Sequence, residues 1–551
     1  MTTRPLAVAV LFAGNALAAD VGQAASSTDW PQWLGPERNG VAAASPKLLD
    51  AWPTNGPSQL WQSEPLGPAG QDGYGSVVVA DGRAYVFVNA KLPVNQGVPQ
   101  DFLDAWGWCE GVPSNLAARI EVALASEKRQ KTPGGIKWNF DERDRLPTVV
   151  ESPELNKFID DFLATLDAET VKTFGDHIRR RLKVGAFNWQ TMTNLGAWKG
   201  KPIPSEEIFR KLFLDISGHS AQTCTITAEA NLLFGRRDVI VCFDAATGRQ
   251  LWRREYPGAS DADSLSATWG ASGTPSVEGG KVYVSGSAGV YCLAAGDGAE
   301  IWKAKSDFNH SSPLVADGRV VFMDRVVLIA RDAATGQLLW RQEKVKQDHR
   351  WWGMSRSVAL WRHEGKSYLI GSGGPGLWCV EPEKGEVVWI RPGEGGGIVR
   401  STPIIAGDVA VVTTDDKVHA FRLAPDKAEL LWSTTPGGDR GGSALVVGDY
   451  VYNGGNHLGG LQCLDLKTGT VRWKQLMTAT EGVTPVLADG KIFFNTGDRG
   501  VIMLRASPEK YELLGNLAHG PVTICTTPAV AGGRLYLRQK TRLACYDVAA
   551  P

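Results

Sequence analysis

The stretch DAATGRQLW, Asp244–Trp252, returns almost unchanged as DAATGQLLW, Asp332–Trp340. Weaker copies keep the same order of a tight turn and a short run that ends in tryptophan. They are AGDGAEIW, EPEKGEVVW, PDKAELLW and DLKTGTVRW, which end at Trp302, Trp389, Trp432 and Trp473. A motif that recurs every few tens of residues indicates a repeat architecture, in which each copy buries its apolar face against its neighbours.

Each repeat reads as four short strands. Stretches such as TPSVEGGKVYVSG from Thr274 and TPVLADGKIFFNT from Thr484 place a Gly-containing turn between two apolar runs, which is a strong hairpin signal. A third run precedes the Asp-x-x-Thr-Gly turn, and a fourth run carries the tryptophan. Four antiparallel strands bury both faces only when copies stack around an axis, so each repeat is predicted to be a propeller blade. The tryptophan is then the large apolar side chain that packs on the next blade.

The number of blades follows from the residues that begin the first strands. Eight are found: Ser76, Thr274, Ser312, Ser357, Thr402, Ser443, Thr484 and Thr527. The stretch YELLG near Leu513 is a degenerate outer strand. The last repeat ends at RLACYDVAAP without an outer strand, and SQLWQSEP around Trp61 supplies one. We therefore expect eight blades, with the last one closed by an N-terminal strand that removes both free edges.

A long insertion interrupts the first blade between RAYVFVN and VIVCFDAATG. Ser152-Pro153 is a helix cap followed by proline at the first helical position, and apolar residues follow at helical spacing from Leu155 to Leu182. The stretch PSEEIFRKLFLDI from Pro204 repeats this pattern. The expected fold is all-β: an eight-bladed β-propeller with a mainly α-helical insertion in blade one. The expected divisions are a signal peptide 1–18, an N-terminal leader 19–57, the propeller 58–91 and 236–551, and the insertion 92–235.

The first residues, MTTRPLAVAVLFAGNALAAD, have a cation, a short apolar core and a small-x-small cleavage site, as a secretory signal peptide does. The apolar core is too short to span a bilayer, and no later stretch of 18 apolar residues exists. We expect an exported protein, periplasmic or extracellular, with no membrane span. The formal net charge of −1 gives no sign of a nucleic-acid partner.

The positions of the cysteines argue against a disulfide framework. Five of the eight occupy the same strand position in successive repeats: Cys242, Cys292, Cys379, Cys463 and Cys545. A cysteine that recurs at one strand position is expected to fill a small apolar slot as a free thiol. Cys109 and Cys224 lie outside the repeats, and their spacing leaves open whether they pair.

The repeated Asp-Ala-Ala-Thr-Gly-x-x-Leu-Trp motif and the leader WPQWLGPERNG, residues 30–40, resemble exported pyrroloquinoline-quinone-like (PQQ-like) β-propeller repeat proteins. That family contains quinoprotein dehydrogenases and BamB-like outer-membrane assembly scaffolds. Its dehydrogenases carry adjacent cysteines over the cofactor, and several carry a haem-binding Cys-x-x-Cys-His. This chain has neither motif, which counts against a bound quinone, and we assign no cofactor and no metal site.

A candidate ligand site lies where the first strands begin, because the innermost strands line the central channel. The residues just before these strands include His310, Arg356 and Arg400, and Arg440 sits one residue outside the column. Clustered guanidinium groups favour carboxylate or phosphate. The alternative is that each arginine bonds neighbouring carbonyls or acidic residues and has a structural role.

A connection on the same face adds His349, Arg350 and Trp351 to the candidate site. Trp351 is followed by Trp352, and two adjacent aromatic side chains in a loop are costly to expose. We expect them to be covered, for example by the insertion, or to face a ligand.

Three functions are compatible with these patterns. The favoured one is a non-enzymatic, exported propeller that binds protein partners. The second is a PQQ-dependent dehydrogenase, an oxidoreductase. The third is a binding module for an anionic small molecule or glycan at the channel. No feature of the sequence assigns an oligomeric state.

The anion-site hypothesis predicts a specific behaviour for Arg400→Ala. If Arg356 and Arg400 lie side by side without enough negative charge to neutralise them, an anion should bind between them. Addition of phosphates, uronic acids or pyrroloquinoline quinone should then raise the melting temperature of the wild type. Arg400→Ala should weaken that binding by about 1.5–3 kcal/mol per lost charged hydrogen bond, with no loss of fold stability. No ligand-dependent shift in the wild type, together with a lower melting temperature for the variant, would support the structural alternative.

Overall fold

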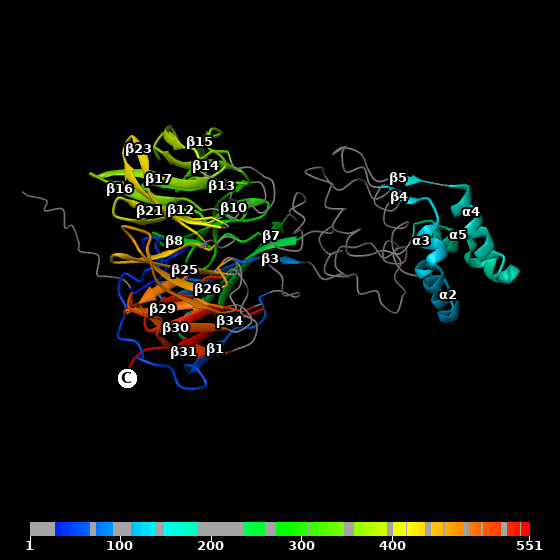
Figure 1. Ribbon diagram of the computed structural model, residues 1–551, viewed down its shortest axis with the longest axis horizontal. Helices are drawn as coiled ribbons and strands as arrows, with labels where there is room; N and C mark the ends of the chain where they lie inside the picture. The colour runs from blue at the N-terminus through cyan, green and yellow to red at the C-terminus, as the bar shows by residue number, and fades with distance from the viewer. Residues whose placement is uncertain are drawn as a thin grey trace, which may run out of the picture.

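The computed structural model describes most of the propeller and part of the insertion. The described residues are 28–66, 73–91, 112–137, 148–150, 152–184, 236–258, 271–306, 309–346, 357–393, 401–414, 416–435, 442–455, 458–477, 482, 484–496, 500–518, 526–539 and 541–551. Eight four-stranded antiparallel sheets form the propeller, which lies on the left of Figure 1. The predicted eight-bladed β-propeller is confirmed.

The strands of the first four blades follow one another from the axis outward. Blade 1 contains β2 (Val78–Ala80), β3 (Arg83–Lys91), β6 (Arg236–Asp244) and β7 (Gln250–Gly258); blade 2 contains β8 (Ser276–Glu278), β9 (Lys281–Ser285), β10 (Gly289–Ala294) and β11 (Glu300–Lys305); blade 3 contains β12 (Leu314–Ala316), β13 (Arg319–Asp324), β14 (Val327–Asp332) and β15 (Leu338–Gln342); blade 4 contains β16 (Ala359–His363), β17 (Lys366–Gly373), β18 (Gly376–Val380) and β19 (Val387–Arg391).

The remaining blades have the same order, except that the last takes its outer strand from the N-terminal part of the chain. Blade 5 contains β20 (Ile404–Ala406), β21 (Val409–Thr413), β22 (Val418–Ala424) and β23 (Lys427–Thr434); blade 6 contains β24 (Leu445–Val447), β25 (Tyr450–Gly455), β26 (Gly460–Asp465) and β27 (Val471–Leu476); blade 7 contains β28 (Val486–Ala488), β29 (Lys491–Asn495), β30 (Val501–Arg505) and β31 (Leu513–Leu517); blade 8 contains β32 (Ala529–Ala531), β33 (Arg534–Arg538), β34 (Leu543–Asp547) and β1 (Gln59–Gln62).

The strand β1 closes the ring as the sequence predicted. It pairs antiparallel with β34, and Trp61 lies opposite Cys545. Trp61 is buried, and its Nε1 donates a hydrogen bond of 3.1 Å to the carbonyl oxygen of Ala245 in blade 1. The N-terminal strand therefore completes blade 8 and also joins it to blade 1.

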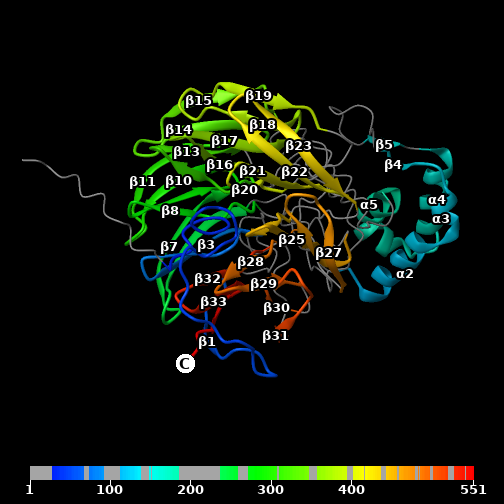
Figure 2. The same cartoon turned by 60° about the vertical axis from the view of Figure 1, so that its left-hand side comes forward.

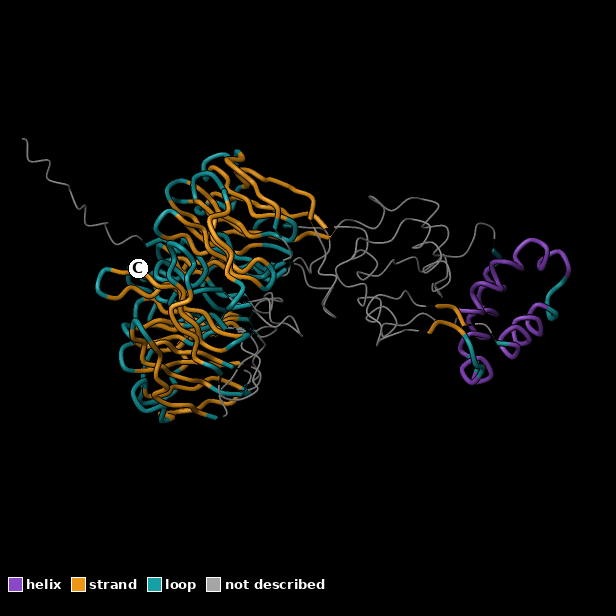
Figure 3. Tube along the Cα trace, turned by 90° about the horizontal axis from the view of Figure 1, so that it is seen from above, coloured by secondary structure: helices purple, strands orange, loops and turns teal. Residues whose placement is uncertain are grey.

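The insertion leaves and re-enters blade 1 through two neighbouring strands. β3 and β6 pair as far as Lys91 and Arg236, and the chain between them contains the helices. Its elements are α2 (Ser114–Ala125), α3 (Glu127–Lys131), β4 (Gly135–Lys137), β5 (Thr148–Val150), α4 (Pro153–Leu163) and α5 (Ala168–Val184). Figure 3 separates these helices, in purple, from the strands of the propeller, in orange.

The helices have a core of their own, and its sequence signals were only partly recognised. The hydroxyl of Ser152 caps α4 by accepting a hydrogen bond of 2.9 Å from the backbone N–H of Leu155, as predicted. Helix α2 was not predicted, although Leu116, Ile120 and Leu124 bury one face at helical spacing. The hairpin of β4 and β5 was also missed. The helix predicted from Pro204 lies outside the described residues.

Each outer tryptophan packs on the turn of the next blade. Trp252 lies on Gly298 in blade 2, where an added Cβ would come within 2.7 Å of the indole ring. Gly298 also has a φ of 71°, so glycine is required there both for conformation and for space. The Nε1 of Trp252 donates to the carbonyl oxygen of Ala295 at 3.0 Å. The repeated glycine and tryptophan therefore form one contact between neighbouring blades.

Blade 7 replaces this tryptophan with a residue from the leader. Gly515 pairs with Met503 at the register position where Trp302 pairs with Cys292 in blade 2. Trp52 fills the free space, because a Cβ on Gly515 would lie 2.5 Å from the Cβ of Trp52. The N–H of Trp52 also donates to the carbonyl oxygen of Leu514 at 2.9 Å. The degenerate strand predicted near Leu513 is thus completed by a distant segment.

The five repeated cysteines are buried and free, as the repeat pattern predicted. Burial raises the pKa of the Cys292 thiol to about 11, so this thiol is protonated at neutral pH. These residues are small apolar side chains of the interblade core. Cys109 and Cys224 lie outside the described residues.

Closure by β1 makes a prediction about stability. Trp61→Ala should reduce the free energy of unfolding by about 3–5 kcal/mol, because it leaves a cavity between blades 8 and 1. Leu60→Ala is the matched control, since Leu60 is 44% exposed on the same strand. Chemical denaturation followed by far-ultraviolet circular dichroism measures both variants. Equal stability of the two would contradict the closing role of Trp61.

Candidate binding site

The channel is surrounded by a ring of hydroxyl groups, formed by the residues that begin the first strands. The backbone N–H groups of six of these eight residues each donate to the hydroxyl of the counterpart in the next blade. The recorded links, of 2.9–3.0 Å, are Ser76 to Thr274, Thr274 to Ser312, Ser312 to Ser357, Thr402 to Ser443, Ser443 to Thr484, and Thr527 to Ser76. All eight residues are buried. The repeated Ser or Thr thus has a structural reason, because it ties adjacent blades together at the axis.

Blade 5 connects this hydroxyl ring to the leader. The hydroxyl of Thr402 accepts a hydrogen bond of 3.2 Å from the Nε1 of Trp33. Trp33 belongs to residues 28–42, which we call the axial segment. This contact places the axial segment at the centre of the ring, a position that the sequence did not predict.

The axial segment crosses the propeller and adds short stretches of backbone to several first strands. Trp30 exchanges two backbone hydrogen bonds with Val79 of β2, at 2.7 and 2.8 Å. The carbonyl oxygen of Pro31 accepts from the N–H of Val277 in β8, also at 2.8 Å. On the far side, Val41 forms a parallel bridge with Leu487 in β28. Figure 2 shows this blue segment across the middle of the ring.

Arg38 is the buried cation of the axial segment. Its guanidinium donates to the carbonyl oxygens of Pro313 and Ser312 at 2.9 and 3.2 Å, and to the Oε1 of Gln32 at 3.1 Å. Arg38 is 2% exposed, and its Nε is buried without a hydrogen-bond partner. Burial lowers the pKa of Arg38, because no carboxylate of the described residues neutralises it. Carbonyl dipoles alone hold this charge at the axis.

Of the seven residues predicted to form the ligand site, only His310 lies among the described residues. His310 lies half-buried in the segment before β12, two residues ahead of Ser312 in the hydroxyl ring. The other proposed site residues lie outside the described residues: Arg356, Arg400, Arg440, His349, Arg350 and Trp351. The hydroxyl ring gives the register of this column, in which Arg356 precedes Ser357 by one residue and Arg400 precedes Thr402 by two. Their grouping into an anion site stays a prediction.

Arg538 is a second buried cation at the axis that the sequence analysis did not identify. It lies at the end of β33 and donates to the carbonyl oxygens of Gly75 and Phe87, at 2.6 and 3.0 Å. These bonds connect blade 8 with blade 1. The sequence signal was available, since Arg538 interrupts an apolar strand at a position where the other blades have no arginine.

A buried carboxylate stands at the base of the insertion. Asp238 in β6 accepts hydrogen bonds from the side chains of Asn89, Ser287 and Tyr291, and from the backbone N–H groups of Ser287 and Ala288. Burial raises the pKa of Asp238, and these hydrogen bonds oppose that shift. The cluster joins the root of the insertion to blade 2, so its role is to position elements.

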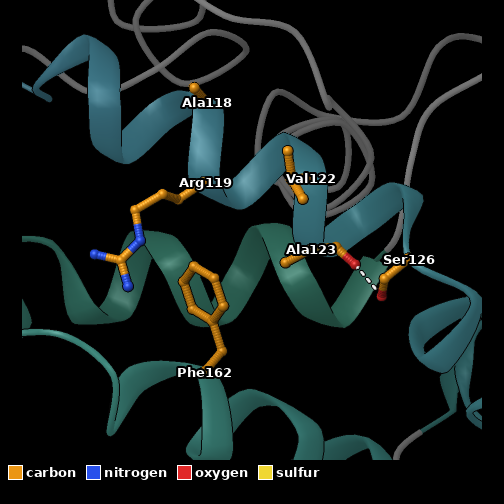
Figure 4. A pocket seen from close by; sticks show the side chains of 6 residues that line it. All are labelled: Ala118, Arg119, Val122, Ala123, Ser126 and Phe162. Atoms are coloured by element: carbon orange, nitrogen blue, oxygen red, sulfur yellow. Dashed lines mark hydrogen bonds between the residues drawn. The ribbon is translucent and has the colours of Figure 1, made fainter.

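The insertion carries a shallow apolar hollow between α2 and α4 (Figure 4). Its volume is about 420 Å³, and it is lined by Ala118, Arg119, Val122, Ala123, Ser126 and Phe162. Val122 is 72% exposed. Arg119 donates to the carbonyl and hydroxyl oxygens of Thr165, which directs its charge away from the apolar floor.

The described part of the chain holds no group of three or more His, Cys, Asp or Glu side chains placed to bind a metal ion. Among the described helices, none is both long and apolar enough to cross a membrane.

Comparison with known families identifies the repeat. The family model described as outer membrane protein assembly factor BamB matches residues 236–475 and 459–550. This match covers more than half of the chain, and the protein belongs to this family of PQQ-like repeat propellers. The resemblance inferred from the Asp-Ala-Ala-Thr-Gly-x-x-Leu-Trp motifs is confirmed.

Individual relatives are more distant. Outer membrane protein assembly factor BamB of Burkholderia pseudomallei is 28% identical over 189 residues, which cover 33% of this chain and 46% of that protein. The chain therefore spans about half the length of this curated relative. BamB from Moraxella catarrhalis is 14% identical, with a TM-score of 0.44 over 56% of this chain and 88% of that one. Quinohemoprotein alcohol dehydrogenase from Comamonas testosteroni is 16% identical, with a TM-score of 0.39 over 57% and 72%.

The hydroxyl ring makes a prediction at Ser443. Ser443→Ala should destabilise the propeller by about 1–3 kcal/mol, because the buried N–H of Thr402 loses its acceptor. Thr470→Ala removes an exposed hydroxyl from the same blade and should change stability by less than about 0.5 kcal/mol. Thermal unfolding of the two variants beside the wild type measures the difference. An unchanged melting temperature for Ser443→Ala would show that the hydroxyl ring does not hold the blades together.

Proposed function

We propose that this protein is an exported scaffold that binds other proteins through the outer surface of its propeller and through its helical insertion. The proposal is supported by membership of a family whose description is an assembly factor. The name of the Burkholderia relative, an outer membrane protein assembly factor, supports a location beyond the inner membrane. Residues 1–18 act in this proposal as the signal peptide, and residues 92–235 as a separate recognition domain.

The distribution of exposed apolar side chains is the observation that carries the proposal. Among the described residues, every large exposed apolar side chain lies on the outermost strand of a blade or on α2: Leu60, Ile301, Leu338, Leu339, Val388, Val471, Leu476, Leu513 and Val122. The outermost strands also present unpaired backbone groups at the sheet edges. Such surfaces favour contacts with proteins, because apolar area and backbone groups are buried together.

The two alternative functions differ in where a ligand would act. A PQQ-dependent dehydrogenase and a module for an anionic ligand both need a ligand at the channel. The dehydrogenases of the family carry adjacent cysteines over the quinone. The described cysteines of this chain are single, buried residues of the interblade core, and they give little support to a quinone site. The hypothesis of an anionic ligand depends on His310 and on arginines that lie outside the described residues.

Purification from the native host under mild crosslinking distinguishes the three functions. The scaffold proposal predicts a partner protein at fixed stoichiometry, whose crosslinks map to the outer strands or to α2. Val122→Glu together with Leu339→Glu should reduce that crosslinking, whereas Lys366→Glu, which changes an exposed charge on the second strand β17 and not on an outermost strand, should not. Quinone absorption in the purified protein, with quinone-dependent oxidation of an alcohol, would refute the proposal and establish the dehydrogenase. A stoichiometric anionic molecule without a partner would establish the third function.

A further inference from the structure

The axial segment is held as a bound peptide is held. Its backbone pairs with the inner edges of β2, β8 and β28, three strands that belong to different blades. Addition of an extended segment to a strand edge is a common mode of peptide recognition, in which backbone hydrogen bonds give affinity and side-chain pockets give specificity. Both components are present here, because Trp30, Leu34 and Arg38 are all buried.

The side chains of the axial segment occupy distinct positions on the propeller. Trp30 covers Gly35, whose added Cβ would lie 3.0 Å from the indole, so the segment folds back on its own tryptophan. Arg38 reaches the carbonyl oxygens of Ser312 and Pro313 at the start of blade 3. A guanidinium suits this geometry because it donates several hydrogen bonds in one plane, which an ammonium group does not do.

The bound conformation is strained and is therefore maintained by the propeller. Leu34 and Arg38 have φ values of 63° and 53°, a region that non-glycine residues rarely adopt. Strain of this kind persists only where surrounding contacts over-determine the backbone. Residues 53–58 connect the leader to β1, so the axial segment has a high effective concentration at its site.

We propose that the centre of this propeller face is a peptide-binding site for a segment that carries Trp and, eight residues later, Arg, and that the axial segment is its intramolecular occupant. The first strands of blades 1, 2 and 7 form the backbone-pairing part of the site. The carbonyl oxygens of Ser312 and Pro313 form the arginine-binding part. This site is separate from the outer surfaces proposed for partner proteins, so either proposal stands or fails without the other.

A nicked full-length protein tests this site. Pro53, Thr54 and Asn55 are exposed, and a protease recognition sequence inserted there permits cleavage after folding. The wild-type leader should stay bound after cleavage and elute with the propeller in size-exclusion chromatography. A fluorescent synthetic peptide of residues 28–52 should then exchange into the nicked protein, with saturation at one peptide per propeller.

Peptide variants measure the specificity of the site without altering the folded protein. Peptides with Arg38→Met and Arg38→Lys should each bind at least about 10-fold more weakly than the wild-type peptide, because the charged hydrogen bonds to carbonyl oxygens are lost or reduced in number. A Glu37→Gln peptide is the matched control, because Glu37 is exposed beside Arg38, and it should bind like the wild type. Release of the wild-type leader on cleavage, or equal binding of the wild-type and Arg38→Met peptides, would overturn the proposal.

Discussion

The hydrogen bond from the backbone N–H of Thr527 to the hydroxyl of Ser76 joins the last blade of the ring to the first. A blade buries both faces only when both neighbours are present, so the first and last blades depend on closure of the ring. Contacts at three distances from the propeller axis close the ring. The hydroxyl ring acts at the axis, Arg538 bonds the carbonyl oxygens of Gly75 and Phe87, and Trp61 on β1 packs against the turn of blade 1 at the outside.

The contact between tryptophan and glycine shows how one motif serves two blades. The glycine permits the turn in its own blade and leaves space for the indole of the preceding blade. Blade 7 shows that an indole ring can reach this interblade space from a segment other than the outer strand. Its outer strand has Gly515 instead of tryptophan, and Trp52 from the leader occupies the vacated position. The leader thus supplies the tryptophan of the interblade core that the outer strand of blade 7 lacks.

The features that could be predicted from the sequence are those encoded by repeated or local motifs. Blade number, closure by the strand around Trp61, the buried cysteines and the cap at Ser152 all follow from local patterns with a direct physical reason. The axial segment could not be predicted this way, because Trp33 and Arg38 contact residues hundreds of positions away and occur only once. The sequence placed the candidate cations before the first strands, whereas the two buried arginines described at the axis, Arg38 and Arg538, come from the leader and from a second strand. Single residues that fill an irregular space carry no periodic signal.

Closure by an N-terminal strand also orders the events of biosynthesis. The N–H of Leu543 bonds the hydroxyl of Ser63 across a separation of 480 residues, so the first strand made must wait for nearly the whole chain. Contacts so distant in sequence form slowly, because loop-closure entropy is lost before they are gained. Until β34 is available, β1 has no strand to pair with and the ring cannot close. Because unpaired strand edges favour aggregation, we expect the chain to be most prone to it before β1 and β34 have paired.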